Sequence, residues 1–194
     1  MITLTSSSFP FIDVSKYFIG NTFFETGTQN GNTAAVAKEF YFDFVHSTEI
    51  KEEYFNFAVE RFRSTRHLHF HLGDSPDVLK EHLIIFDKPC TFFLDAHHTG
   101  PMMYPYEFLG EAGMSKKYGL SPIMEELEVI KMAKCNTHTI MIDDVKDFDL
   151  WSPHFKATDI VNKLYSINKD YKIIYVNACR EGKRPGQLLI AYLE

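Results

Sequence analysis

The chain alternates between short apolar runs and longer segments whose apolar residues recur every three or four positions. Short apolar runs are typical of buried strands, and the three-to-four-residue recurrence is typical of amphipathic helices. The first strand ends at Glu25, and a helix begins near Ala34. Further strands are predicted at residues 42–48, 67–72, 90–94, 137–142, 172–176 and 187–192. Further helices are predicted at residues 51–63, 78–83 and 121–133, and a last helix is predicted to be capped by Thr158.

Strands that alternate with helices form a mainly parallel sheet with right-handed crossovers. The last two predicted strands are too close for a helical crossover, so they should pair antiparallel. The pattern therefore predicts the fold class α/β: a three-layer, Rossmann-like sandwich around a mainly parallel seven-stranded sheet with a C-terminal antiparallel hairpin. Residues 21–194 form a single domain, with an N-terminal arm at 1–20 and an irregular insertion at about 98–120.

The composition supports one well-filled domain, because 45% of the 194 residues are hydrophobic and 18 Phe and 10 Tyr supply bulky core side chains. The net charge of −6, without a long basic cluster, argues against a nucleic-acid partner. Cys90, Cys135 and Cys179 are far apart, as expected in a reducing compartment. Neither a secretion signal nor a membrane-spanning segment is found. We therefore expect a soluble cytoplasmic protein without a membrane partner.

The most informative stretch joins the first strand to the first helix and contains two glycines four residues apart. Glycine permits a sharp turn there, and free backbone amides at the helix start can face a ligand above the strand ends. The pattern E-x-G-x-x-x-G, formed by Glu25, Gly27 and Gly31, resembles the first motif of class I S-adenosylmethionine-dependent methyltransferases. The dinucleotide fingerprint differs, because it has a glycine where Glu25 stands. Together with the terminal hairpin, the resemblance covers nearly the whole chain and implies S-adenosylmethionine as the cofactor.

Four acids follow consecutive strands and therefore line one edge of the expected sheet: Glu25, Glu49, Asp74 and Asp95. In the family that the sequence resembles, the acid after the second strand holds both ribose hydroxyls, and Glu49 matches that position. The resemblance also places Glu25 near the methionine portion, and Asp74 with Ser75 near the adenine amino group. The alternatives are a solvated acid for Glu49 and a plain helix cap for Asp74.

A second set of acids consists of Asp95 after the fourth strand and Asp143 with Asp144 after the fifth. This set resembles the metal-dependent branch that includes catechol and caffeoyl-coenzyme A O-methyltransferases. There, an Asp after the fourth strand and an Asp-Asn pair after the fifth hold a magnesium or calcium ion. The resemblance implies that Asp95, Asp143 and Asp144 bind Mg²⁺ or another divalent cation, which prefers oxygen ligands. In the alternative, Asp143 and Asp144 only cap a loop, and Asp95 contacts the sulfonium side of the cofactor without metal.

The resemblance also suggests a base for the reaction. In the catechol-type enzymes the base is a lysine three residues after the first metal-binding aspartate, and here that position is His98. A neutral imidazole is a competent base near pH 7, so His98 and Asp95 are candidate catalytic residues, with His97 as the alternative base. The insertion at 98–120 is rich in Met and aromatic residues. It is expected to cover a small-molecule acceptor or, alternatively, to form a contact within a homo-oligomer.

His67, His69 and His71 share one face of the third predicted strand. No fourth ligand accompanies them in the pattern, so a partly exposed polar stripe is expected rather than a metal site. The sequence thus predicts an S-adenosylmethionine-dependent methyltransferase that acts on oxygen of a small acceptor. A nicotinamide-dependent oxidoreductase and a non-catalytic cofactor-binding module on the same fold are the alternatives.

Overall fold

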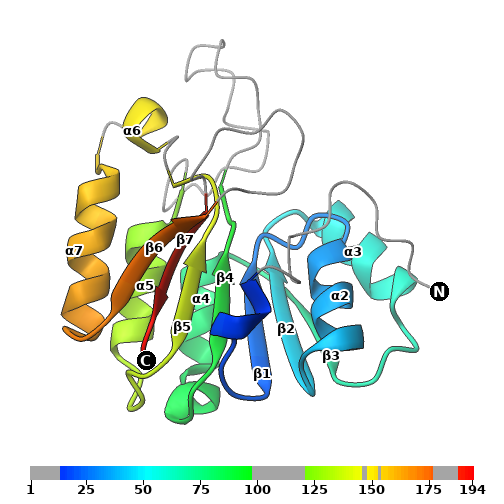
Figure 1. Cartoon of the computed structure of the whole chain (residues 1–194). Coiled ribbons are helices and arrows are strands. Elements are labelled where there is room, and N and C mark those ends of the chain that lie inside the picture. Colours follow the sequence, from blue (N-terminus) through cyan, green and yellow to red (C-terminus); the bar gives the residue numbers. More distant parts are fainter. Residues whose placement is uncertain (1–13, 98–120, 146–147, 153, 177–187) are drawn as a thin grey trace.

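The computed structural model describes residues 14–97, 121–145, 148–152, 154–176 and 188–194, which contain a seven-stranded sheet of order β3-β2-β1-β4-β5-β7-β6 (Figure 1). The strands are β1 (Thr22–Thr26), β2 (Phe44–Glu49), β3 (Leu68–Leu72), β4 (Thr91–Leu94), β5 (Thr139–Ile142), β6 (Lys172–Val176) and β7 (Leu188–Tyr192). Strands β1 to β5 pair in parallel, and β7 pairs antiparallel with both β5 and β6. The predicted fold class is confirmed, including the antiparallel C-terminal hairpin.

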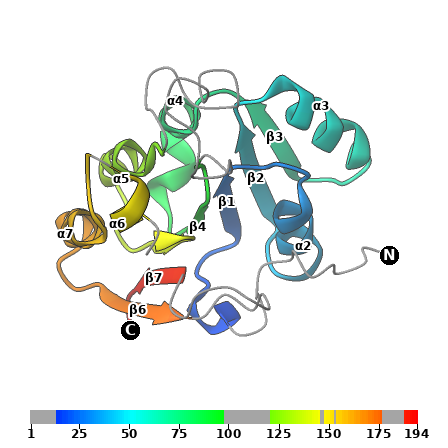
Figure 2. The ribbon, with the colours of Figure 1, turned by 90° about the horizontal axis from the view of Figure 1, so that it is seen from above.

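Helices cover both faces of the sheet and give the predicted three layers (Figure 2). One face carries α2 (Asn32–Phe40) and α3 (Glu52–Arg61). The other face carries α4 (Ser75–Glu81), α5 (Ile123–Lys131) and α7 (Ala157–Ile167). The shorter segments are η1 (Ser15–Tyr17), η2 (Leu83–Asp87) and α6 (Phe148–Trp151).

Alternate side chains of the central strands build two separate cores. In β1, Phe23 packs in the core that includes α2, whereas Phe24 packs in the core beneath α4 and α5. In β4, Phe93 and Phe92 divide between the same two cores. All four rings are buried, because a central strand with a helix layer on each face has no solvent side. Successive aromatic residues in the sequence therefore serve opposite faces.

The helices begin within a few residues of the predicted positions, and the starts of α4 and α7 show why the two differ. Helix α4 begins at Ser75, with Pro76 in its first turn, where the missing N–H of proline costs no hydrogen bond. Helix α7 has Lys156 as its N-cap residue, and the backbone N–H of Lys156 donates to Asp159 Oδ2 at 2.8 Å. The prediction that Thr158 caps this helix is therefore wrong, because the Asp159 carboxylate reaches back to the chain before the helix.

The described part of the predicted arm, residues 14–20, runs past the amino ends of the central strands. The Thr91 hydroxyl donates to Ile19 O and accepts from Ile19 N, both at 2.9 Å. The Thr139 hydroxyl donates to Tyr17 O at 2.6 Å. Since Thr91 and Thr139 are the first residues of β4 and β5, this part of the arm lies at the edge of the sheet opposite the carboxyl ends of the strands.

Some predictions fall on residues outside the described ones. These include residues 1–13 of the arm, the insertion at 98–120 with His98, and Cys179. Among the helices of the described ranges, none combines the length and apolar character needed to cross a membrane.

The packing of α5 against the sheet leads to a stability prediction. Leu127 is fully buried in the core beneath α4 and α5, so Leu127→Ala should lower the free energy of unfolding by about 2–5 kcal/mol, measured by urea denaturation. The control is Ile84→Ala, because Ile84 is 80% exposed and its loss should change stability by no more than about 0.5 kcal/mol. Equal losses for the two variants would contradict the assignment of α5 to the core.

Candidate functional site

The sheet has a topological switch point between β1 and β4. These two strands are parallel neighbours, with Thr26 opposite Leu94 at their carboxyl ends. β1 leads to α2 on one face, and α5, the next described helix after β4, lies on the other face. Open α/β sheets bind ligands outside the carboxyl ends of the strands at such a point. The candidate site is therefore expected at these two strand ends.

The turn after β1 has a left-handed backbone at three positions: Gly27 with φ of 85°, Gln29 with 47° and Gly31 with 72°. A Cβ atom on Gly27 would lie 2.6 Å from the carbonyl oxygen of Asp95, so only glycine fits there. This confirms the expectation that a side chain at Gly27 would obstruct the turn. A Cβ atom on Gly31 would instead meet the Phe62 ring at 2.9 Å, so the close approach at Gly31 is to a core side chain.

Glu49 ties this turn to the start of α3. Its Oε2 accepts from the backbone N–H of Gln29 at 2.8 Å, and its Oε1 accepts from that of Lys51 at 2.9 Å. The side chain is buried, with only 7% of the residue exposed, so the alternative of a solvated acid is wrong. Each carboxylate oxygen can accept a second hydrogen bond, which leaves Glu49 able to bind ribose hydroxyls beside the turn.

Glu25 lies beneath the turn and is only 1% exposed. Its Oε2 accepts from Ser47 Oγ at 2.5 Å, and Ser47 Oγ lies 2.6 Å from Thr28 Oγ1 within hydrogen-bond distance. Burial raises the pKa of Glu25 well above its ordinary value, which favours the neutral acid. Glu25 therefore supports the glycine turn from below, and its predicted place near the methionine portion stays a prediction.

A buried acid that the sequence reading missed stands beside the first turn of α4. Ser75 Oγ donates a short hydrogen bond to Glu126 Oε1 of α5, and Glu126 also interacts with Thr26 at the end of β1. Burial raises the pKa of Glu126 to about 7. The sequence does contain a sign that Glu126 is buried. It lies within the apolar stripe of its helix, three residues after Ile123 and four before Ile130.

Asp74 occupies the N-cap position of α4 but makes no side-chain capping hydrogen bond. The simple helix-cap alternative is therefore not supported, and the carboxylate can serve another partner. Asp74 and Ser75 are the N-cap residue and the first residue of α4. The hydroxyl of Ser75, however, is engaged with Glu126.

The loop after β4 brings a histidine between two aspartates. His97 Nε2 lies 3.1 Å from Asp95 Oδ1 and 3.3 Å from Asp144 Oδ2. Burial alone would lower the pKa of His97, but the carboxylates of Asp144 and Asp95 outweigh burial and raise it to about 10. Asp95 is held in place because Thr26 Oγ1 accepts from the backbone N–H groups of Asp95 and Ala96, at 3.2 and 3.3 Å.

The predicted metal ligands are arranged differently from a divalent-ion site. The His97 imidazole, whose pKa the two carboxylates raise, lies between Asp95 and Asp144, where the resemblance would put the cation. Asp143 is buried, and its backbone N–H donates to Leu94 O at 3.2 Å. Within the described ranges, the one group of three or more ligand-type side chains that converges to within 4.8 Å is formed by histidines elsewhere in the fold. The three aspartates therefore do not fit a bare divalent ion in this arrangement.

Comparison with solved structures identifies the fold. Aeropyrum pernix fibrillarin with natively bound S-adenosyl-L-methionine has a TM-score of 0.60 and 10% identity, over 96% of this chain and 75% of its own. Precorrin-6y C5,15-methyltransferase from Geobacter metallireducens has a TM-score of 0.59 and 13% identity, over 94% and 86%. An O-methyltransferase from Bacillus cereus in complex with SAH has a TM-score of 0.56 and 16% identity, over 90% and 74%. The chain therefore has the Rossmann-like fold of class I methyltransferases. No protein-family model and no curated protein matches its sequence.

The buried acid Glu126 leads to a prediction of pH-dependent stability. Its pKa is about 7 in the folded chain against an ordinary value of 4.5, so the folded state holds more protons between these values. The contribution of Glu126 to the free energy of unfolding should therefore fall as pH rises from 4.5 to 7. Glu126→Gln mimics the neutral acid, and its advantage over the wild type should grow across this window by on the order of 3 kcal/mol.

The measurement is urea denaturation at several pH values between 4 and 8. Glu125→Gln, an exposed change one residue away on the same helix, is the matched control and should show a much flatter difference. A Glu126→Gln difference that does not vary with pH would mean that Glu126 has the same pKa in the folded and the unfolded chain, and would contradict the prediction.

Proposed function

We propose that this chain is an S-adenosylmethionine-dependent methyltransferase that transfers a methyl group to an oxygen of a small-molecule acceptor. The observation that carries the proposal is the turn between β1 and α2, where Gly27 packs on Asp95 and Gln29 donates to Glu49. This turn stands at the switch point of a fold shared with proteins solved with S-adenosyl-L-methionine and with SAH. Ligands of open α/β sheets bind at that place.

The described residues suit the separate parts of S-adenosylmethionine. Glu49 has lone pairs left for the ribose hydroxyls, and Asp74 is available at the start of α4 for the adenine amino group. The Asp95 carboxylate, 31% exposed as a side chain, can face the positive sulfonium. When bound, this group supplies an electrophilic methyl group. Glu25, which is buried beneath the turn, supports it from below and is proposed to stand near the methionine portion.

The proton of the acceptor hydroxyl must be removed during transfer. The two candidate bases, His97 and His98, differ in their ability to accept it. His97 is paired with Asp95 and Asp144, which keep it protonated at neutral pH. A group that already carries a proton cannot accept another, so His97 in this arrangement is a poor base. This supports His98, which lies outside the described residues, as the base of the proposed reaction. His97 then fixes the position of Asp95 in the crevice.

The divalent ion is a separate part of the proposal. The imidazolium of His97 supplies positive charge between Asp95 and Asp144, so an ion there would have to displace the ring. Methyl transfer is therefore proposed to proceed without a metal ion at this place. Catalysis then depends on positioning the acceptor oxygen against the methyl group and on removing its proton.

The first prediction from this proposal concerns cofactor binding. S-adenosylhomocysteine should raise the melting temperature, because it binds only the folded chain; at about 100 times its dissociation constant the stabilisation is ~2.7 kcal/mol. Glu49→Gln should reduce the shift strongly, since one oxygen that can hold a ribose hydroxyl becomes an N–H₂ group. Differential scanning fluorimetry measures both.

Glu52→Gln, an exposed change in the first turn of α3, is the control and should keep the full shift. If S-adenosylhomocysteine leaves the melting temperature of the wild type unchanged and NADH raises it, the nicotinamide-dependent oxidoreductase would replace the methyltransferase as the proposed function. Binding of S-adenosylhomocysteine without methyl transfer to any acceptor in a broad panel would favour the non-catalytic module.

A further prediction concerns chelation. Transfer of a labelled methyl group to small hydroxylated aromatic acceptors should continue in excess chelator, because His97 occupies the space between the two aspartates. Activity that disappears on chelation and returns with magnesium, manganese or calcium would instead restore the predicted site at Asp95, Asp143 and Asp144. Recovery by zinc alone would point to another site.

A further inference from the structure

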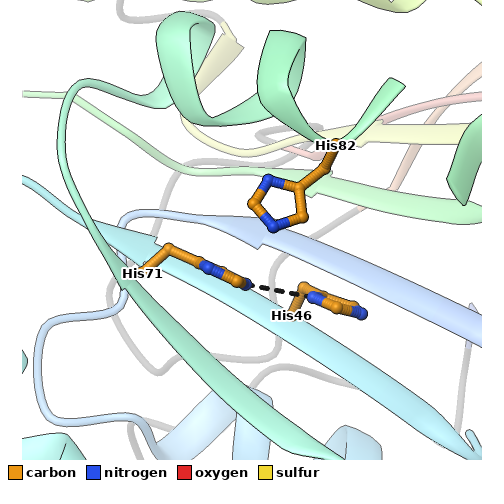
Figure 3. Close-up of side chains that lie close together, drawn as sticks. All are labelled: His46, His71 and His82. Carbon is orange, nitrogen blue, oxygen red and sulfur yellow. Dashed lines mark hydrogen bonds between the residues drawn. The ribbon is translucent and has the colours of Figure 1, made fainter. Parts of the chain in front are cut away.

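Three histidines from three different elements meet on the face of the sheet beneath α4, and none of them belongs to the group of Asp95, His97 and Asp144 (Figure 3). His46 belongs to β2, His71 to β3, and His82 is the C-cap residue of α4. One ring nitrogen from each lies within 4.8 Å of the others, and His46 Nδ1 is 3.0 Å from His71 Nε2. Residues far apart in sequence thus present three imidazole nitrogens to one point.

His82 is oriented by its own helix. Its Nδ1 lies 2.8 Å from the carbonyl oxygen of Val78, one turn earlier in α4. A carbonyl can only accept, so Nδ1 carries the proton and Nε2 keeps its lone pair. Figure 3 shows this second nitrogen facing His46 and His71. Metal-binding histidines are commonly held in this way, with one nitrogen bonded to a carbonyl and the other free to ligate.

The surroundings of the three rings also suit a metal ligand. Phe24 lies parallel to the rings of His46 and His71, with centroids 5.8 and 6.3 Å away, and forms an apolar wall. Burial and neighbouring histidines lower the pKa of His46 to about 3 and that of His71 to about 4. Both rings are therefore neutral near pH 7, which is the form of imidazole that binds a metal ion.

The spacing requires only a small adjustment. Two imidazole nitrogens bound to a tetrahedral ion at about 2.0–2.1 Å lie about 3.3 Å apart. His46 and His71 are 3.0 Å apart, and His82 is within 4.8 Å of both, so modest side-chain rotations bring the three to ligand distance. Imidazole nitrogens suit zinc and its first-row neighbours, whereas magnesium and calcium prefer oxygen.

We propose that His46, His71 and His82 bind one divalent transition-metal ion of the zinc class, with the fourth coordination position open to water or another ligand. Three protein ligands with an open position are a recognised zinc arrangement. The ion would join the edge strand β3 and its neighbour β2 to the end of α4. The site is independent of methyl transfer, since it lies beneath the opposite end of α4 from Asp74 and Ser75.

The test uses the full chain, freed of any polyhistidine tag and of bound metal, and the probes Zn²⁺ and Co²⁺. Zinc should bind with one ion per chain in isothermal titration calorimetry and raise the melting temperature, while magnesium should do neither. Cobalt should give the visible absorption bands of a four-coordinate ion. His82→Gln should weaken zinc binding by more than ~10-fold, because loss of even an indirect partner of a ligand costs about 10–100-fold.

His69→Gln is the matched control, because His69 is exposed and lies next to His46 on the same sheet face. It should keep the wild-type affinity. His71→Gln is a second ligand variant, and circular dichroism and the metal-free melting temperature show whether each variant is folded. Absence of stoichiometric zinc binding by the wild type, or equal affinity of wild type and folded His82→Gln, would overturn the proposal.

Discussion

The backbone contact between Gly27 and Asp95 is the constraint around which the crevice is built. A side-chain carbon at Gly27 would lie 2.6 Å from the Asp95 carbonyl oxygen, so the turns after β1 and β4 meet with no space for one. Thr26 strengthens the same junction by accepting from the backbone N–H groups of Asp95 and Ala96. Since β1 and β4 are neighbours, this junction fixes where both strand ends stand. The acids of the site take their positions from it.

Several acidic side chains lie at one edge of the sheet. If all were ionised, their negative charges would repel one another, and little water is present there to screen them. The structure resolves this repulsion in three ways. Glu25 and Glu126 are buried, which raises their pKa values and favours the neutral acids. Glu49 accepts hydrogen bonds from two backbone N–H groups, those of Gln29 and Lys51. His97 balances Asp95 with its own charge. A crevice with this distribution can accept a cofactor whose sulfur is positive.

The sequence predicted the strands, which of them run parallel and the antiparallel terminal hairpin, because periodicity and connection length are local properties of the chain. It also predicted Gly27, since a strand-to-helix turn has a local signature. It missed Glu126 and the proximity of His71 to His46 and His82, because those contacts join elements far apart in sequence. Adding His46 and His82 to His71 required the pairing of β2 with β3 and the position of α4. His67 and His69, which the sequence had grouped with His71, are exposed.

Helix α4 connects the two sites, and its anchoring suggests how they relate. Its first residue, Ser75, is bonded to Glu126 beside the crevice, whereas His82 at its other end faces β2 and β3. Between them Val78 and Leu79 are buried in the core, so the helix is held along its length by packing and not only by its ends. A ligand shifts an equilibrium only by its differential affinity for the two states. Because the core already fixes α4, an ion at His82 has little further ordering to contribute at Ser75. Zinc binding and cofactor binding are therefore expected to be energetically independent, so that loss of one leaves the affinity of the other unchanged.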